Sequence, residues 1–200
     1  DGTLPDWKSF HFPTWANPHI KQSEVDEARQ NMSDRAFRQE IAAEFMDDAG
    51  GVFRNVRAAA TAPKVDGPQA NHTYVAGLDW ALSSDYTALT VIDVTTKQDV
   101  YSSRFNGLDY NLQRQRLAND CKRWGVSALI AEANAMGKPN NDEVRRLGVP
   151  VRDFTTTNTT KAEIIERLAA AFDNAGIQIQ NDQVLIGELE AYEQERLTSG

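Results

Sequence analysis

The spacing of hydrophobic residues along the chain changes near residue 73. Before that point they recur every three or four positions, a spacing that predicts two helices. The first is expected at about 24–31, where Ser23 and Asp26 form a capping-box pattern. Ser33 can cap the second, which carries Phe37, Ile41, Ala42 and Phe45 on one face and ends near the segment DDAGG.

Strands are expected after residue 73. The segments TYVAGLDWA, YTALTVIDV and VYSSRF are rich in β-branched and apolar residues and are joined by short polar breaks. Such short connections predict an antiparallel meander of three strands.

Helices and strands alternate in the remaining sequence. A helix is expected at about 110–124, with Cys121 on its buried face. The next segment, VSALIAEA, is almost continuously apolar, which is typical of a central strand covered on both faces. A short helix in NDEVRRLG, a strand in VPVRDF, a long helix opened by Thr160 and Glu163, and a terminal helix follow. This order predicts an α/β fold with a ribonuclease H-like mixed sheet, flanked by helices.

The same pattern predicts three parts. Residues 1–57 form a helical segment, residues 58–72 are rich in Ala, Pro and Gly and form a linker, and residues 73–200 form the α/β domain.

Composition narrows the range of functions. The net charge of −8 argues against a surface that is basic everywhere, so any contact with nucleic acid must be a local patch or be helped by metal ions. No apolar run approaches the roughly 20 residues that span a bilayer, and no signal peptide is apparent. Because Cys121 is the single cysteine, it has no disulfide partner in the chain. We expect a soluble intracellular protein.

Two carboxylates are placed to meet at the edge of the predicted sheet. The two-residue period of a strand puts Val75, Gly77 and Asp79 on one face, and it puts Glu132 at the end of a later strand. These strands are neighbours in the expected fold, so Asp79 and Glu132 can approach each other. Paired carboxylates suit Mg²⁺ or Mn²⁺, which prefer hard oxygen ligands.

Ordinary structural roles compete with these interpretations. Taken alone, Asp79 fits a turn or a helix cap, and Asp85 in the segment SSD fits a turn even better. An ordinary structural role explains Glu132 less well, because this residue lies at the end of an apolar strand. Lys161 begins a helix, where the dipole disfavours a cation, so it is either a solvated lysine or a phosphate contact.

These segments together resemble the large terminase subunit of tailed bacteriophages. The stretch GLDWALSSDYTAL is similar to the first nuclease motif of that family, and the resemblance implies that Asp79 is the main metal ligand and Asp85 a further acid. The stretch IAEANAMG is similar to the second motif, which maps onto Glu132, Asn134 and Gly137. The resemblance implies a nuclease that uses two divalent cations, Mg²⁺ or Mn²⁺, to cleave double-stranded concatemeric DNA.

The resemblance extends to both ends of the chain. TTTNTTKAEIIERL matches the family's lysine at the start of the next helix, here Lys161, and residues 1–57 resemble the segment that leads from the packaging ATPase to the nuclease. The ATPase motifs are absent from this sequence. The family's last nuclease acid follows a G-x-HDD-like segment, which is expected beyond Gly200, and Glu188 and Glu190 do not match it.

The resemblance also implies partners and location: double-stranded DNA, and the small terminase subunit and portal protein through the full-length protein, in the host cytoplasm and with no membrane. Two other functions stay open. The chain could be a catalytically silent DNA clamp or docking module of the packaging motor. An actin-like ATPase has the same order of strands in its sheet, but its phosphate-binding loop requires glycine where this chain has Trp80 and Ala81.

Overall fold

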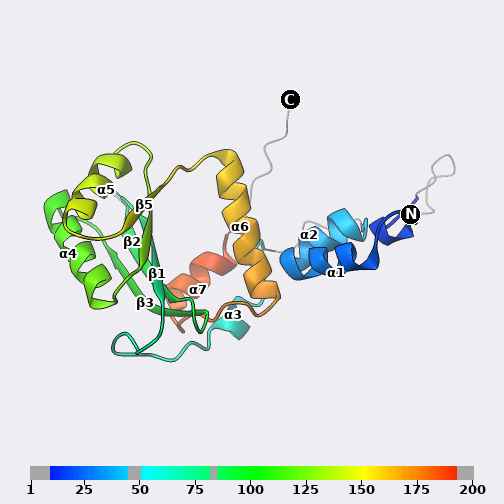
Figure 1. Ribbon diagram of the computed structural model, residues 1–200, viewed down its shortest axis with the longest axis horizontal. Helices are drawn as coiled ribbons and strands as arrows, with labels where there is room; N and C mark the ends of the chain where they lie inside the picture. Colours follow the sequence, from blue (N-terminus) through cyan, green and yellow to red (C-terminus); the bar gives the residue numbers. More distant parts are fainter. Residues whose placement is uncertain (1–9, 45–50, 82–84, 193–200) are drawn as a thin grey trace.

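The computed structural model describes residues 10–44, 51–81 and 85–192, and within them the central element is a five-stranded mixed sheet (Figure 1). Its strands are β1 Tyr74–Asp79, β2 Thr87–Asp93, β3 Gln98–Phe105, β4 Ala128–Glu132 and β5 Val151–Phe154. Their order across the sheet is β3-β2-β1-β4-β5. Strands β1 to β3 pair antiparallel, whereas β4 and β5 continue the sheet parallel to β1. The predicted mixed sheet, a meander followed by alternating helices and strands, is confirmed.

Seven α-helices are found among the described residues. They are α1 Gln22–Asn31, α2 Asp34–Ala36, α3 Val56–Ala59, α4 Tyr110–Arg123, α5 Gly137–Arg146, α6 Asn158–Asp173 and α7 Gln183–Glu190. A 3-10 turn at Thr14–Ala16 and a π-helical turn at Phe37–Ile41 accompany them. Phe45 and most of the segment DDAGG, where the second helix was expected to end, lie outside the described residues.

Two predicted helix starts were wrong. Helix α1 begins at Gln22 without a side-chain cap, because the Asp26 carboxylate accepts a hydrogen bond from the Gln22 amide at 2.9 Å instead of capping the helix. Helix α6 begins at Asn158, because Thr157 is its cap and Thr160 supplies the reciprocal hydrogen bond that Glu usually makes. The Ser33 cap is confirmed, since its hydroxyl accepts from the Ala36 N–H at 3.1 Å.

Helices α4 and α5 cover one face of the sheet (Figure 1). Alternate residues of β1 point into this core, where they meet the fully buried Leu117 and Trp124. Helix α4 presents Cys121 to the same core, as expected, and burial raises the pKa of its thiol to about 12. The first core therefore joins the strands to α4 and α5 and contains an unreactive thiol.

Helices α3, α6 and α7 form a second core of their own. Phe53 packs edge-on against Phe172 with ring centres 5.9 Å apart, and Ile179 and Ile186 complete the centre. Among the described residues, no member of β1 to β5 belongs to this cluster. The apolar side of α6 thus packs against other helices and not against the sheet.

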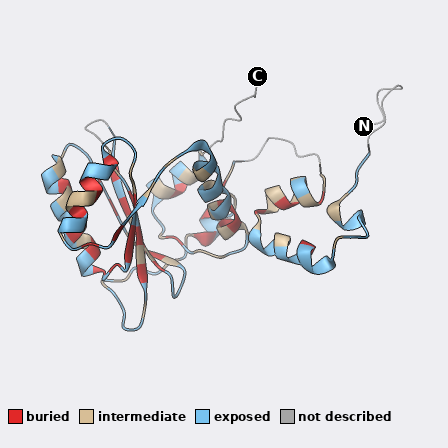
Figure 2. Cartoon of the chain, turned by 45° about the horizontal axis from the view of Figure 1, so that its top comes forward, coloured by how far each residue is buried: buried red, intermediate tan, exposed pale blue. Residues whose placement is uncertain are grey.

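The N-terminal helices attach to α6 through backbone donors. The N–H of Ser33 donates to Glu166 at 3.1 Å, and the N–H of Asp34 donates to Asp173 at 2.8 Å. Their own small core is centred on Val25 and Phe37, and most of their surface is exposed (Figure 2).

The second face of the sheet is open at β4, so the prediction that this strand is covered on both faces was wrong. Leu129 and Ala131 are fully buried against the first core, whereas the intervening Ile130 is 48% exposed. Gly77 and Asp79 of the neighbouring strand are exposed on that same face. The apolar run in β4 therefore reflects one buried face and one exposed isoleucine.

One-sided burial of β4 can be tested with two adjacent substitutions. Leu129→Ala should lower the free energy of unfolding by about 3 kcal/mol, because it leaves a cavity in the first core. Ile130→Ala should cost less than about 1 kcal/mol, because its side chain already faces solvent. Urea denaturation of both variants measures the difference, and equal losses would contradict an open second face.

Candidate metal centre

Asp79 and Glu132 end two neighbouring parallel strands. The last paired residues of β1 and β4 are Leu78 and Ala131, so the two acids follow directly, side by side. A hydrogen bond joins their carboxyl groups. The fold thus brings together the two acids that were expected to approach each other at the ends of neighbouring strands.

This arrangement raises the pKa of Asp79 to about 6. Partial loss of water around the carboxyl group is the largest cause, although the residue as a whole remains exposed. The hydrogen bond and the charge of Glu132 come next, followed by the charge of Asp85, while the N–H of Trp80 acts in the opposite direction. Two neighbouring carboxylates whose charges repel each other are a site where a divalent cation can bind, and their hard oxygens fit Mg²⁺ or Mn²⁺.

Asp85 lies close enough for its charge to act on Asp79, but it does not complete a ligand cluster. Its Oδ1 accepts a hydrogen bond from the N–H of Tyr86 at 2.7 Å, and the side chain is exposed. Within the described ranges, no group of three or more His, Cys, Asp or Glu residues is placed to hold one metal ion. The described site therefore consists of one acid pair with a third acid nearby.

Gly137 lets helix α5 begin against the end of β4. A Cβ atom at this position would lie 2.2 Å from the carbonyl oxygen of Glu132, which is far inside van der Waals contact. The Gly137 N–H also donates to the carbonyl of Asn134 at 2.8 Å. Glycine is therefore required by the close approach of two backbones, and this contact helps to fix the position of Glu132.

Asn134 ties the loop after β4 to the loop after β5. Its amide nitrogen donates to the carbonyl of Thr156 at 2.8 Å, and its amide oxygen accepts from the N–H of the same residue at 3.2 Å. These two hydrogen bonds resemble the pair that two backbone residues exchange in a β-sheet. In this structure Asn134 supports the loops around the acid pair.

Asn141 was missed by the sequence analysis, although it links both catalytic candidates. It is fully buried, its Oδ1 accepts from the Trp80 indole at 2.8 Å, and its Nδ2 donates to the backbone carbonyl of Glu132 at 3.1 Å. Since Trp80 directly follows Asp79, the amide connects the ends of β1 and β4. A signal was present, because Asn141 shares a helical face with Gly137 and the buried Val144.

Asp153 on β5 anchors this amide from the other side. It accepts from Asn141 Nδ2 at 3.0 Å, and it forms ion pairs with Lys138 at 2.9 Å and Arg145 at 3.2 Å. The hydrogen bond from Lys138 is the largest influence that lowers the pKa of Asp153. The carboxylate therefore stays charged and continues to accept hydrogen bonds over the ordinary pH range.

Lys161 is exposed in the first turn of α6. Its backbone N–H donates to the carbonyl of Thr157 at 2.9 Å, while its ammonium group forms no hydrogen bond or ion pair with any described residue. The structure therefore leaves this cation available to solvent.

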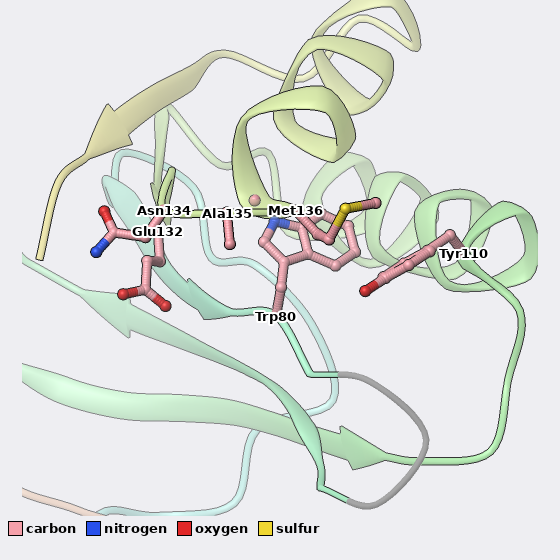
Figure 3. A pocket seen from close by; sticks show the side chains of 7 residues that line it. Trp80, Tyr110, Glu132, Asn134, Ala135 and Met136 are labelled. Atoms are coloured by element: carbon pink, nitrogen blue, oxygen red, sulfur yellow. The ribbon is translucent and has the colours of Figure 1, made fainter.

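A pocket of about 190 Å³ adjoins the acid pair. Trp80, Tyr110 and Met136 form its apolar side, while the carboxylate of Glu132 points away from these rings, next to Asn134 (Figure 3). The indole of Trp80 is held by Asn141 and meets the Tyr110 ring nearly perpendicularly. One side of Glu132 is thus bordered by packed aromatic groups.

No helix in the described part of the chain is long and apolar enough to cross a membrane. No protein-family model matches the chain.

Curated relatives are large terminase subunits. The terminase large subunit of Thermus virus P23-45 is 26% identical over 207 aligned residues, which include 99% of this chain and 43% of that protein. The terminase large subunit of Escherichia phage T5 is 40% identical over 53 residues, or 26% of this chain. The resemblance drawn from the motifs is confirmed. The chain spans less than half the length of the first of these relatives.

Solved structures show the same fold. The large terminase nuclease of the thermophilic phage G20c with bound magnesium matches with a TM-score of 0.70 and 22% identity, over 76% of this chain and 85% of that one. Similar structures of that nuclease hold zinc or cobalt. The large terminase of bacteriophage D6E matches 92% of this chain with a TM-score of 0.70, at 13% identity. The ribonuclease H-like α/β fold predicted for this domain is thereby confirmed.

The close approach at Gly137 predicts that two Gly→Ala substitutions will change the free energy of unfolding by different amounts. Gly137→Ala should lower the free energy of unfolding by at least about 2 kcal/mol, because the added methyl group collides with the Glu132 backbone. Gly187→Ala in α7 meets nothing within 4 Å and should be neutral or stabilising by up to about 1 kcal/mol. Chemical denaturation measures both, and a harmless Gly137→Ala would show that α5 can move away from β4.

The raised pKa of Asp79 predicts a stability that depends on pH. Between the ordinary value of 3.8 and about 6 the unfolded chain ionises first, so stability falls as pH rises through this window and the loss is complete above it. Asp79→Asn should therefore raise the free energy of unfolding near pH 7.5, without divalent metal, by on the order of 1 kcal/mol after allowance for solvent screening. The gain should shrink as pH is lowered toward 4.

Asp142→Asn provides a control of opposite sign. The hydrogen bond from Lys138 is the main cause that lowers the pKa of Asp142, so its charge favours the folded state above the ordinary pKa. This variant should be destabilised near pH 7.5, as measured by thermal melts across pH. Stabilisation by both substitutions would mean that net charge, and not the Asp79–Glu132 pair, causes the effect.

Proposed function

We propose that the chain is the nuclease part of a viral DNA-packaging terminase, and that it cleaves double-stranded concatemeric DNA by two-metal hydrolysis of the phosphodiester bond. The observation that carries this proposal is the pair of hydrogen-bonded carboxyl groups at the adjacent ends of β1 and β4. Its support is the relatedness to terminase large subunits and the fold shared with large terminase nucleases that hold divalent metals.

Asp79 and Glu132 are the proposed metal ligands, and Asp85 is the proposed outer acid. Divalent cations bound there supply an activated water and positive charge at the phosphate that is cut. A cation bound there would compete with the proton of Asp79, whose pKa is raised to about 6, so metal affinity should rise as pH rises through about 6. Asn141 and Gly137 keep the two strand ends at a fixed separation.

A further ligand is proposed from the family resemblance, which places one more acid beyond Gly200. Among the described residues, no third His, Cys, Asp or Glu joins Asp79 and Glu132 in a group that could hold a metal ion. Lys161 is proposed as a phosphate contact, and Asn134 and Gly137 as supports of the site.

The proposed context follows from the relatives as whole proteins. Residues 1–57 would link the nuclease to a packaging ATPase, residues 58–72 would connect the two, and residues 73–200 would form the nuclease domain. The small terminase subunit and the portal protein would bind through the full-length protein, in the host cytoplasm.

Plasmid nicking tests the proposal directly. With Mg²⁺ or Mn²⁺, the chain, or a longer form that includes the residues after Gly200, should convert supercoiled plasmid to nicked and linear DNA, and EDTA should abolish this. Asp79→Asn and Glu132→Gln should each lower the rate by at least about a hundredfold, because each removes a metal ligand. Gel densitometry over time measures the rates.

Asp26→Asn on α1 is the control, because this exposed acid lies outside the site. It should cut at the unchanged rate. Metal-independent DNA binding without cleavage, in both the chain and its longer form, would instead identify a silent clamp. Full activity of Glu132→Gln would remove Glu132 from the ligand set.

A further inference from the structure

Arg152 lies on the same sheet face as the acid pair. Across the sheet, Gly77 is in register with Ile130, and Ile130 with Arg152. Residues in register on neighbouring strands point to the same side, so Arg152 shares the open face with Asp79. It is two residues before Phe154, which is the partner of Glu132.

This face is accessible over several strands. Gly77 and Arg152 are exposed, and Ile130 is 48% exposed between them. Helices α6 and α7 lie on this side of the sheet (Figure 1), but they pack into the second core, which contains no described strand residue. The strand residues between Asp79 and Arg152 are therefore exposed on this face.

The guanidinium of Arg152 has no hydrogen-bond acceptor among the described residues. It forms no hydrogen bond or ion pair with any residue in the described ranges, although two carboxylates end the next strands. Three other arginines are paired: Arg104 with Glu188 at 3.2 Å, Arg145 with Asp153 and Arg146 with Glu143. Because arginine carries five donors and a permanent charge, an exposed, unpaired one beside a metal site is suited to an anion.

We propose that double-stranded DNA crosses this open face and that Arg152 binds a backbone phosphate close to the one that is cut. The proposal rests on the nuclease function proposed above. Arg152 is offset from Glu132 by one strand and by two residues, which cover roughly 7 Å along a strand, so the contacted phosphate is a near neighbour of the cleaved one. With a net charge of −8 the chain has no uniformly basic surface, and a local positive contact is one way for it to hold a phosphate backbone.

On the β3 side of this face the arginine is already paired. Arg104 on β3 lies in the row of Asp79 and Ala88, but its guanidinium stacks over the Tyr86 ring at 4.1 Å and pairs with Glu188 of α7. This arginine joins the sheet to a helix. The phosphate contact is therefore assigned to the β5 side of the acid pair.

Salt-dependent DNA binding tests the role of Arg152. The probe is a fluorescent 30-base-pair duplex in Ca²⁺, titrated from 50 to 200 mM salt. Arg152→Gln should weaken binding roughly tenfold and lower the slope of log K against log salt by about 0.9, the value for one lost phosphate contact. Arg152→Lys should retain most of the slope, because the charge remains.

Arg146→Gln is the matched control, since this exposed arginine is already paired with Glu143 at the end of α5. It should bind DNA as the unchanged chain does. Equal affinity and slope in Arg152→Gln, with plasmid cleavage still dependent on Asp79, would overturn the inference alone. A lower melting temperature with unchanged DNA binding would show that Arg152 contacts a protein segment, which also overturns it. Absence of both DNA binding and cleavage, in the unchanged chain and in its longer form, would overturn the nuclease proposal as well.

Discussion

The other parts of the site are arranged around two carboxyl groups that are held together at neighbouring strand ends. Partial loss of water, together with the hydrogen bond and the charge of the neighbouring Glu132, raises the pKa of Asp79. Such a pair opposes folding at neutral pH unless a cation offsets it. The surrounding contacts hold the acids together despite this cost, which is the arrangement expected of a binding site and not of a structural ion pair.

The contacts that hold the pair are mainly backbone contacts and one buried amide. Gly137 brings α5 against the Glu132 carbonyl, and Asn141 connects that carbonyl to the Trp80 indole beside Asp79. Because these groups act on the backbone, they position the acids and leave the carboxylate oxygens for other ligands. Asp153 and its two cationic partners complete the support.

The division of the apolar residues into two cores controls access to the site. Helices α4 and α5 bury one face of the sheet, while α6 and α7 pack with α3 around Phe172. A single continuous core would have covered the acids. The same division explains why Ile130 is exposed in the middle of an apolar strand, and why an unpaired arginine remains on that face.

Local spacing of apolar residues was enough to predict the order of strands and helices and the helix at 110–124. It also predicted the common face of Gly77 and Asp79, because side-chain direction in a strand has a period of two. The meeting of Asp79 with Glu132 followed once the strand order was known. Local pattern could not show that β4 has an open face, since an apolar run is the same whether one side or both are covered. It also could not identify Asn141 as a link between strands. Its partners lie 61 and 9 residues away along the chain, and only the packing of α5 on the strand ends brings their polar atoms within hydrogen-bonding distance.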